Sequence, residues 1–206
     1  MPPSESRART FTETARRAQI IAAAIDTVNA IGFHRASLAE IATRARVAKS
    51  AIVYYFSSRD ALMLSVVEEV FSRVETAVAA AEVVEGGPAA RLGAYARAYL
   101  SYVDGHRAEV TAGVEIVVSH RVEDGTPLYL LRDPDDSSLL RRILREGMDE
   151  GAFRRMPLDV AVTLVESLLD VWTSELQRDL EAELGSFGEQ IVEFLLQGIA
   201  PSPDAA

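Results

Sequence analysis

The sequence predicts an all-α fold, and three observations support that prediction. Apolar residues recur every three or four positions along most of the 206 residues, which is the period of an amphipathic helix. No segment alternates apolar and polar residues in the way that a half-buried strand does. Glycine and proline fall between the periodic segments, where they end one helix and precede the next. We therefore expect about nine helices and no sheet.

Three helices are expected first. The segment 12–31 carries an apolar stripe and is stopped by Gly32. The stripe consists of Ile21, Ala24, Ile25 and Val28. Ser37 and Glu40 have the spacing of a capping box, which predicts a second helix beginning at Ser37. A third short helix is expected over residues 48–56, and the two serines that follow it at positions 57 and 58 end it.

Six further helices are expected in the remainder of the chain. They cover residues 60–81, 88–104, 107–120, 137–150, 157–184 and 187–199. The strongest break is Gly86-Gly87-Pro88, and proline is tolerated at the first position of a helix. The segment 122–136 contains a glycine and two prolines and is expected to be a loop.

The composition excludes several classes of protein. The chain has no cysteine, so disulfides, thiolate metal sites and a cysteine nucleophile are all excluded. No apolar run approaches the roughly 18 residues of a membrane span, and the first residues lack the apolar stretch of a signal peptide. We expect a soluble cytoplasmic protein with no membrane partner.

Charge is distributed unevenly along the chain. The net charge is −10, but residues 1–60 carry nine basic and five acidic side chains, a net +4, so the remainder carries −14. Binding to phosphate draws much of its free energy from lysine and arginine. A basic N-terminal segment on an acidic body is therefore suited to a protein that presents one region to a nucleic acid while the rest is repelled.

Residues 37–56 meet the requirements of a helix-turn-helix, in which two short helices flank a tight turn and the second helix enters the major groove. Taken alone, this pattern also fits two helices that only pack in a core. The residue identities are more specific. In order along the chain, they are Gly32-Phe33, Ser37-Leu38-Ala39-Glu40-Ile41-Ala42, Ala45-Arg46-Val47-Ala48-Lys49, Ile52, Tyr54-Tyr55-Phe56 and Ser58-Arg59-Asp60-Ala61-Leu62.

In this order and spacing, the segment 12–64 resembles the N-terminal signature of TetR-family transcriptional regulators. The segment 144–153 is similar to the seventh-helix turn of many members. The resemblance implies a three-helix DNA-binding domain followed by a larger helical ligand-binding and dimerisation domain. It also implies a repressor that binds near-palindromic operator DNA and is released by a small molecule.

The resemblance implies that residues 48–56 are the recognition helix and supply most DNA contacts. The candidate DNA-binding residues are Ser37, Arg46, Lys49, Ser50, Val53, Tyr54, Tyr55 and Arg59. Lysine can neutralise a phosphate or reach a guanine edge, and tyrosine hydroxyls can donate to phosphate oxygens. Ser37 can bind phosphate at a helix N-terminus, and Arg59 stands where the family usually has a lysine that contacts the DNA backbone.

Three residues depart from the family pattern. Arg46 replaces the glycine that is usual in the turn, which costs about 1 kcal/mol if that residue is left-handed. Ala48 removes the usual hydroxyl cap, and Val53 replaces a common tyrosine. These departures keep a second interpretation open, namely a helical ligand-binding or interaction protein whose DNA-binding unit is degenerate.

Residues 61–206 contain no recognisable catalytic or metal-binding constellation, and the three histidines of the whole chain, His34, His106 and His120, are isolated. We expect no enzyme activity, no metal and no cofactor. The segment does contain side chains that suit a pocket for a largely apolar small-molecule effector. The candidate ligand-binding residues are Met63, Phe71, Tyr95, Tyr99, Tyr102, Glu115, Met148, Asp170 and Trp172. If Glu115 or Asp170 lines the pocket, a cationic or hydroxyl-bearing ligand is favoured.

The expected organisation is a flexible basic arm at 1–11, a DNA-binding domain at 12–60, a ligand-binding and dimerisation domain at 61–200 and a tail at 201–206. The last two helices carry more apolar surface than one small domain needs. The residues concerned are Val160, Leu164, Leu168, Ile191, Phe194 and Leu195. A homodimer joined through helices eight and nine is expected, as a four-helix interface.

Overall fold

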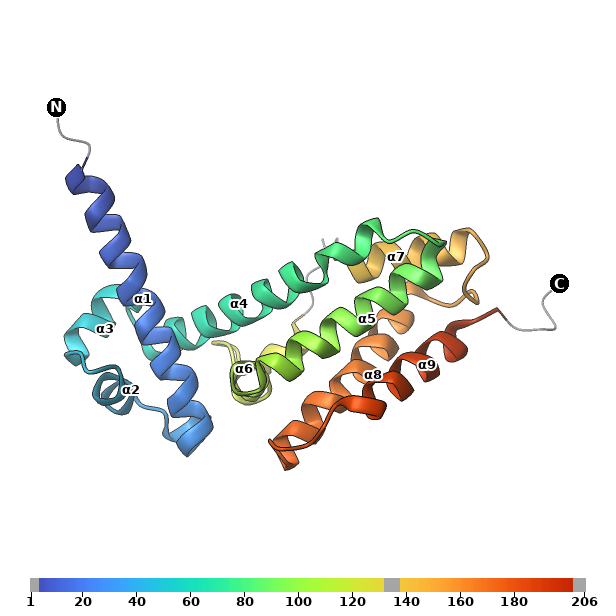
Figure 1. Cartoon of the computed structure of the whole chain (residues 1–206). Coiled ribbons are helices and arrows are strands. Elements are labelled where there is room, and N and C mark those ends of the chain that lie inside the picture. Colours follow the sequence, from blue (N-terminus) through green and yellow to red (C-terminus); the bar gives the residue numbers. More distant parts are fainter. Residues whose placement is uncertain (1–3, 132–137, 202–206) are drawn as a thin grey trace. The chain divides into compact units, whose positions relative to one another are not determined.

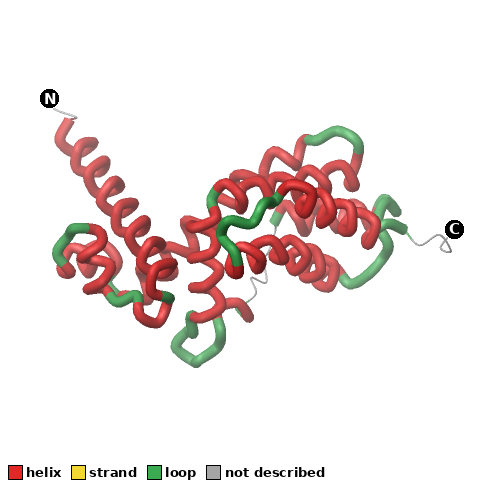
Figure 2. The backbone as a smooth tube through the Cα atoms, turned by 60° about the horizontal axis from the view of Figure 1, so that its bottom comes forward, coloured by secondary structure: helices red, strands yellow, loops and turns green. Residues whose placement is uncertain are grey.

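The computed structural model describes residues 4–131 and 138–201, and these residues form helices and connecting loops without a sheet (Figures 1 and 2). The all-α prediction is confirmed. The α-helices within this range are α1 (Ser4–Ile31), α2 (Leu38–Ala45), α3 (Lys49–Phe56), α4 (Arg59–Val78), α5 (Gly87–Gly105), α6 (Arg107–Ser119), α7 (Leu139–Asp149), α8 (Leu158–Arg178) and α9 (Gly185–Ile199). Short 3-10 helices are η1 (Phe33–Arg35), η2 (Ala79–Val83) and η3 (Leu128–Leu130).

Two helix ends differ clearly from the expected ones. α1 begins at Ser4, so the residues from Ser4 onward of the expected arm belong to this helix. α8 ends at Arg178, before the expected end at residue 184. The cause is Asp179, whose backbone is extended and whose carboxylate accepts the N–H of Glu181 at 2.9 Å. Most of the expected tail, residues 202–206, lies outside the described residues.

Backbone contacts divide the chain into two units, which we describe separately. Unit 1 comprises Met1–Phe71 and Ala108–Leu131, so α6 joins the N-terminal helices. α1 packs against α2, and the expected stripe on α1 is buried. At Gly113 of α6, an added Cβ would lie 3.1 Å from the side chain of Val70, so the missing side chain lets α6 and α4 approach closely.

Unit 2 comprises Ser72–Arg107 and Arg132–Ala206 and is built from α5, α7, α8, α9 and the end of α4. α5 contacts each of the other three α-helices. The interior of unit 2 is apolar, with Leu92, Leu144 and Trp172 almost fully buried. Gly147 of α7 lies against Phe153, where an added Cβ would be 2.1 Å from the ring. This part of the segment 144–153 therefore forms a close-packed turn.

Candidate functional site

One half of the capping box predicted at residue 37 is present, and the Ser37 N–H donates instead to the Arg35 carbonyl oxygen at 2.8 Å. The Ser37 hydroxyl oxygen accepts the backbone N–H of Glu40 at 3.2 Å and so caps α2. α2 ends at Ala45, and its C-cap residue Arg46 adopts the left-handed conformation with φ 53° and ψ 45°. A side chain in this conformation costs about 1 kcal/mol relative to glycine, and the glycine replaced here would have avoided that cost.

The short helix α3 has one buried and one exposed face. Ile52 and Phe56 are buried in unit 1. Lys49 and Ser50 are exposed, and Val53 and Tyr54 expose 43% and 75% of their surface. Tyr55 is half-buried, with its ring edge-to-face against that of Tyr54 at 5.1 Å. Of these two tyrosines, Tyr54 therefore has the more accessible side chain.

The N-terminus of α3 has no side-chain cap. Its N-cap residue is Ala48, and no side chain accepts a hydrogen bond there. The first N–H groups of a helix lack intrahelical partners and attract anions. The expected loss of the hydroxyl cap is confirmed, and Lys49 begins the helix beside these N–H groups.

Arg17 of α1 contacts the C-terminal end of α3, and the sequence did not indicate this role. Its guanidinium donates to the Tyr55 carbonyl oxygen at 3.1 Å and to the Ser65 hydroxyl oxygen at 3.2 Å. It also lies 4.4 Å from the centre of the Phe56 ring. Arg17 thus connects α1 to both α3 and α4. The partners are 38 and 48 residues away in sequence, so local spacing carries no sign of them.

Arg59, expected to clamp a phosphate, has partners within unit 1. Its guanidinium donates to the carbonyl oxygen of Ala36 at 2.8 Å and to that of Phe33. It lies 4.3 Å above the Phe33 ring. These contacts join the first residue of α4 to η1, the turn that precedes α2. A phosphate contact from Arg59 stays a prediction.

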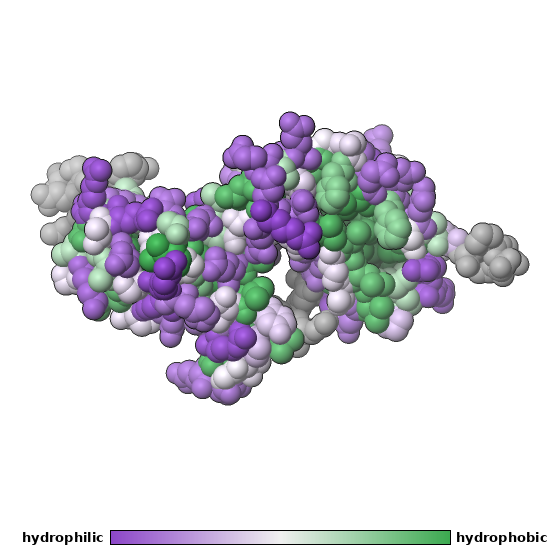
Figure 3. Space-filling model, turned by 90° about the horizontal axis from the view of Figure 1, so that it is seen from below, coloured by the Kyte–Doolittle hydropathy of each residue, from purple (hydrophilic) through white to green (hydrophobic). Residues whose placement is uncertain are grey.

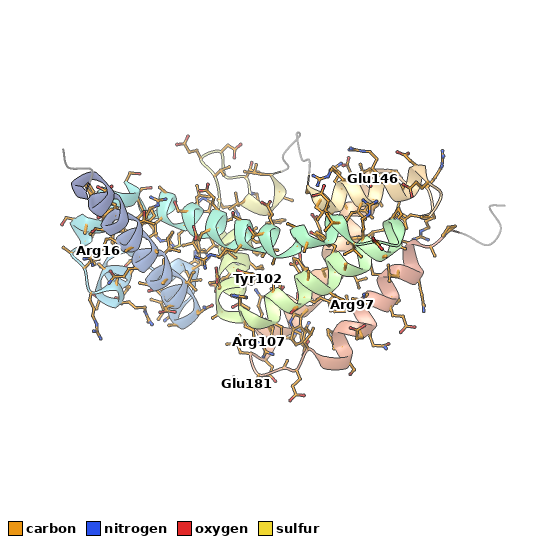
Figure 4. The ribbon with its side chains drawn as sticks, turned by 45° about the horizontal axis from the view of Figure 1, so that its top comes forward. Arg16, Arg97, Tyr102, Arg107, Glu146 and Glu181 are labelled. Carbon is orange, nitrogen blue, oxygen red and sulfur yellow. The ribbon has the colours of Figure 1, made fainter. Side chains whose placement is uncertain are left out.

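The nine candidate ligand-binding residues are divided between the two units. Met63, Phe71 and Glu115 lie in unit 1, and Tyr95, Tyr99, Tyr102, Met148, Asp170 and Trp172 lie in unit 2. In unit 1, Met63 is fully buried, and a Glu115 carboxylate oxygen accepts the backbone N–H of Phe33 at 2.6 Å. In unit 2, Tyr102 and Arg107 lie near the end of α5 and the start of α6, as labelled in Figure 4.

Unit 2 brings two of the candidates together. The Tyr99 hydroxyl donates to a carboxylate oxygen of Asp170 at 2.8 Å. Surrounding protein atoms desolvate both groups and raise the pKa of each, and the Asp170 charge raises that of Tyr99 further. The hydrogen bond from Tyr99 opposes the rise at Asp170, although desolvation outweighs it. Tyr99 therefore remains the proton donor of the pair.

Trp172 occupies the interior of unit 2 and is 1% exposed. Its ring lies 5.7 Å from that of Phe187 and 5.8 Å from the Arg107 guanidinium carbon. Among the described residues, its indole N–H has no hydrogen-bond acceptor. Burying a donor without an acceptor costs free energy, so this group requires a specific explanation.

α8 and α9 share an apolar outer face, visible as a green area in the right half of Figure 3. A groove of about 390 Å³ runs between the two helices. Its lining includes Leu164, Leu168, Val171, Phe194 and Ile199. Phe194 exposes 69% of its surface, whereas the expected interface residues Ile191 and Leu195 are buried within the unit.

Phe187 also belongs to this outer face, and the sequence analysis missed it. It lines a second hollow with Phe194, seven residues further along α9. Residues seven apart lie on the same side of a helix, so this spacing could have identified the pair.

The described residues contain no group of three or more side chains arranged to hold a metal ion. None of the described helices is long and apolar enough to cross a membrane.

Residues 20–66 match the family model described as bacterial regulatory proteins of the tetR family. The HTH-type transcriptional regulator BetI of Klebsiella pneumoniae (strain 342) is 36% identical over 63 residues, which cover 31% of this chain and 32% of that protein. The regulator RutR of Escherichia coli (strain K12) is 39% identical over 57 residues, 28% of this chain and 27% of that protein. The matched segment thus spans about a third of each relative's length.

Solved structures share the fold over most of the chain. The fatty acid degradation regulator FadR from Bacillus halodurans superposes with a TM-score of 0.74 at 20% identity, covering 89% of this chain and 95% of that one. FadR from Bacillus subtilis, solved with stearoyl-CoA, gives a TM-score of 0.70 at 21% identity, covering 88% and 98%. Residues 20–66 therefore match the tetR family of bacterial regulatory proteins, and the fold over most of the chain is that of these solved regulators.

Proposed function

We propose that the chain is a ligand-responsive transcriptional repressor that binds near-palindromic operator DNA as a homodimer and is released by a small molecule. The observation that carries this proposal is the accessible face of α3. Lys49, Ser50 and Tyr54 are exposed on a helix whose other face is buried and whose end is fixed by Arg17. A rigid helix with exposed basic and hydroxyl side chains suits entry into a major groove.

The apolar face of α8 and α9 supports the homodimer. Val160, Leu164 and Phe194 expose 46%, 54% and 69% of their surface. Three large apolar side chains on two adjacent helices form a surface of the kind that partners cover. A second copy of the same two helices would complete a four-helix interface and place two recognition helices on one operator.

Unit 2 supports a small-molecule effector. The indole N–H of Trp172 is a buried donor for which a ligand acceptor would be a partner. Asp170, on the same helix, and Tyr99, on α5, supply a hydrogen-bonded carboxylate and hydroxyl elsewhere in the unit. We propose a largely apolar effector with at least one polar group. Stearoyl-CoA, found with the Bacillus subtilis regulator, is one compound to be tested among others.

The test starts with duplex DNA selected from a randomised pool by the full chain. Affinity is then measured from low to high salt. Lys49→Ala is expected to weaken binding and to reduce the slope of log affinity against log salt by about 1, because one phosphate contact is lost. Arg145→Ala, which removes an exposed arginine of α7, is the matched control and should leave the slope unchanged.

A chain that selects no duplex at all would contradict the proposed function. That result would favour the alternative of a helical ligand-binding or interaction protein with a degenerate DNA-binding unit. Equal salt slopes for the parent and Lys49→Ala would contradict the assignment of Lys49 to a phosphate.

A further inference from the structure

Both ends of the helix-turn-helix are tied to one buried residue, Phe33. η1, where Phe33 lies, leads into α2, and Arg59 follows α3. The Phe33 carbonyl oxygen accepts from the Arg59 guanidinium, which also donates to the carbonyl of Ala36. Phe33 is 5% exposed, and its ring lies under the same guanidinium. The position of Phe33 therefore sets both the entry to α2 and the exit from α3.

Phe33 is held in turn by α6. Its backbone N–H donates to a carboxylate oxygen of Glu115 at 2.6 Å, across 82 residues of sequence. The N–H groups at the start of a helical turn lack partners within that turn, so Glu115 acts as a cap supplied by another helix. No side chain of the segment that precedes η1 provides such a cap.

The residue that precedes Phe33 has a backbone conformation that favours glycine. Gly32 has φ 83° and ψ 154°, a conformation that residues with a Cβ rarely adopt. A Cβ at this position would lie 3.5 Å from the same Glu115 oxygen. The turn thus directs the Phe33 N–H toward α6 in a way that depends on glycine.

α6 is itself anchored to other parts of unit 1. The Asn29 side-chain amide donates to the carbonyl oxygen of Ala108 at 2.7 Å, and Gly113 packs against Val70. His120, just after α6, meets the Phe33 ring edge-to-face at 6.1 Å. Glu115 is the charged group through which this anchored helix reaches the backbone of the turn.

We propose that Glu115 is a positioning residue for operator binding rather than a ligand contact. Its carboxylate fixes Phe33, Phe33 fixes Arg59, and the two ends of the helix-turn-helix are thereby held at the separation that presents α3 to DNA. A displacement of α6 that withdrew the carboxylate would leave the Phe33 N–H unsatisfied and release both ends. This inference rests on the proposed function, because its readout is the affinity for DNA.

The test compares four variants of the full chain on the duplex that the parent selects. Glu115→Ala and the shape-preserving Glu115→Met remove the acceptor and are expected to lower affinity about tenfold. Glu115→Gln keeps an amide oxygen as acceptor and should retain parental affinity. Glu123→Ala removes an exposed carboxylate of the same unit and is the control. The salt slope should be unchanged throughout, because no phosphate contact is removed.

Amide hydrogen exchange gives a readout that does not involve DNA. The Phe33 amide should exchange faster in Glu115→Ala and Glu115→Met than in the parent and Glu115→Gln, at temperatures where all remain folded. Parental affinity in a folded Glu115→Met variant would overturn the proposal. A reduced salt slope would also overturn it, because Glu115 would then affect phosphate contacts directly. If the parent selects no duplex but the exchange difference persists, the proposed DNA-binding function is wrong. The hydrogen bond between Glu115 and the Phe33 N–H is then still supported.

Discussion

Units 1 and 2 are both helical, but they differ in the contacts that stabilise each unit internally and in the residues that each exposes on its accessible face. In unit 1, charged side chains bond to distant backbone groups, as Arg17, Arg59 and Glu115 do. In unit 2, Arg107 makes one such contact, to the Leu180 carbonyl oxygen at 2.5 Å, and several other arginines form ion pairs with carboxylates, such as Arg91 with Glu146 at 2.6 Å. The accessible face of α3 carries lysine, serine and tyrosine, whereas that of α8 and α9 is apolar. The difference agrees with the partners proposed above, since binding of DNA to unit 1 would be sensitive to salt and a second copy on unit 2 would be held by apolar burial.

The largest expected effect tests the apolar face of unit 2. Phe194→Asp places a charge where a partner would bury an aromatic ring, so we expect the dimer dissociation constant to rise about 1,000-fold, or about 4 kcal/mol. Sedimentation at micromolar concentration measures it. Tyr129→Asp, at an aromatic residue of unit 1 that is 53% exposed, should leave the mass unchanged. A monomeric parent would refute the dimer and with it this half of the comparison.

The next effect tests the close packing inside unit 2. Gly147→Ala would put a Cβ 2.1 Å from a ring carbon of Phe153, so the turn must shift. We expect a loss of about 2–3 kcal/mol in the free energy of unfolding, measured by urea denaturation. Gly105→Ala, where an added Cβ meets nothing within 4 Å, is the control and should be close to neutral. Equal stabilities of the two variants would show that unit 2 accommodates the methyl group by moving.

A smaller effect concerns the turn of unit 1. Arg46→Gly relieves a left-handed side chain and is expected to stabilise the fold by up to about 1 kcal/mol, partly offset by the greater entropy of glycine when unfolded. If Arg46 also contacts phosphate, the same variant binds the selected duplex more weakly. Arg46→Lys keeps both the charge and the strain and should match the parent in stability. A destabilised Arg46→Gly would mean that the exposed guanidinium makes contacts worth more than the strain.

The smallest effect tests the Tyr99–Asp170 pair. Because the folded state raises the pKa of Asp170, it favours the neutral carboxyl, and ionisation destabilises the fold as pH rises above the usual carboxyl range. Asp170→Asn can still accept from Tyr99 and carries no charge. The melting temperature of Asp170→Asn relative to the parent should therefore increase from about pH 4 to pH 7. A relative gain by the parent over this range would mean that the charge is stabilised by its surroundings.

The local parts of unit 1 were predictable from sequence. The cap at Ser37 and the buried face of α3 depend on residues within four positions of one another, and both were found as expected. The end of α8 was not, because the apolar period continues past Arg178 while Asp179 forms a turn with its own carboxylate. Periodicity detects which face is apolar and is insensitive to where a polar side chain ends the helix.

The partners of the charged residues could not be predicted. Glu115 was assigned to a pocket because it interrupts an apolar run, and its hydrogen bond to Phe33 joins segments 82 residues apart. Arg59 was assigned by its place in the signature, which does not reveal the carbonyl groups of η1. Residue type indicates that a charge needs a partner, and only the fold determines which one.

The discontinuity of unit 1 has a consequence for the order in which the protein can assemble during synthesis. The Phe33 N–H and the Val70 side chain receive their partners from α6, which is translated only after α4 and α5. During synthesis, the Phe33 N–H and the Val70 side chain therefore lack these partners until residue 119 has left the ribosomal exit tunnel. The helix-turn-helix is therefore synthesised before residues 72–107 of unit 2, but it receives its last contacts only after those residues have emerged.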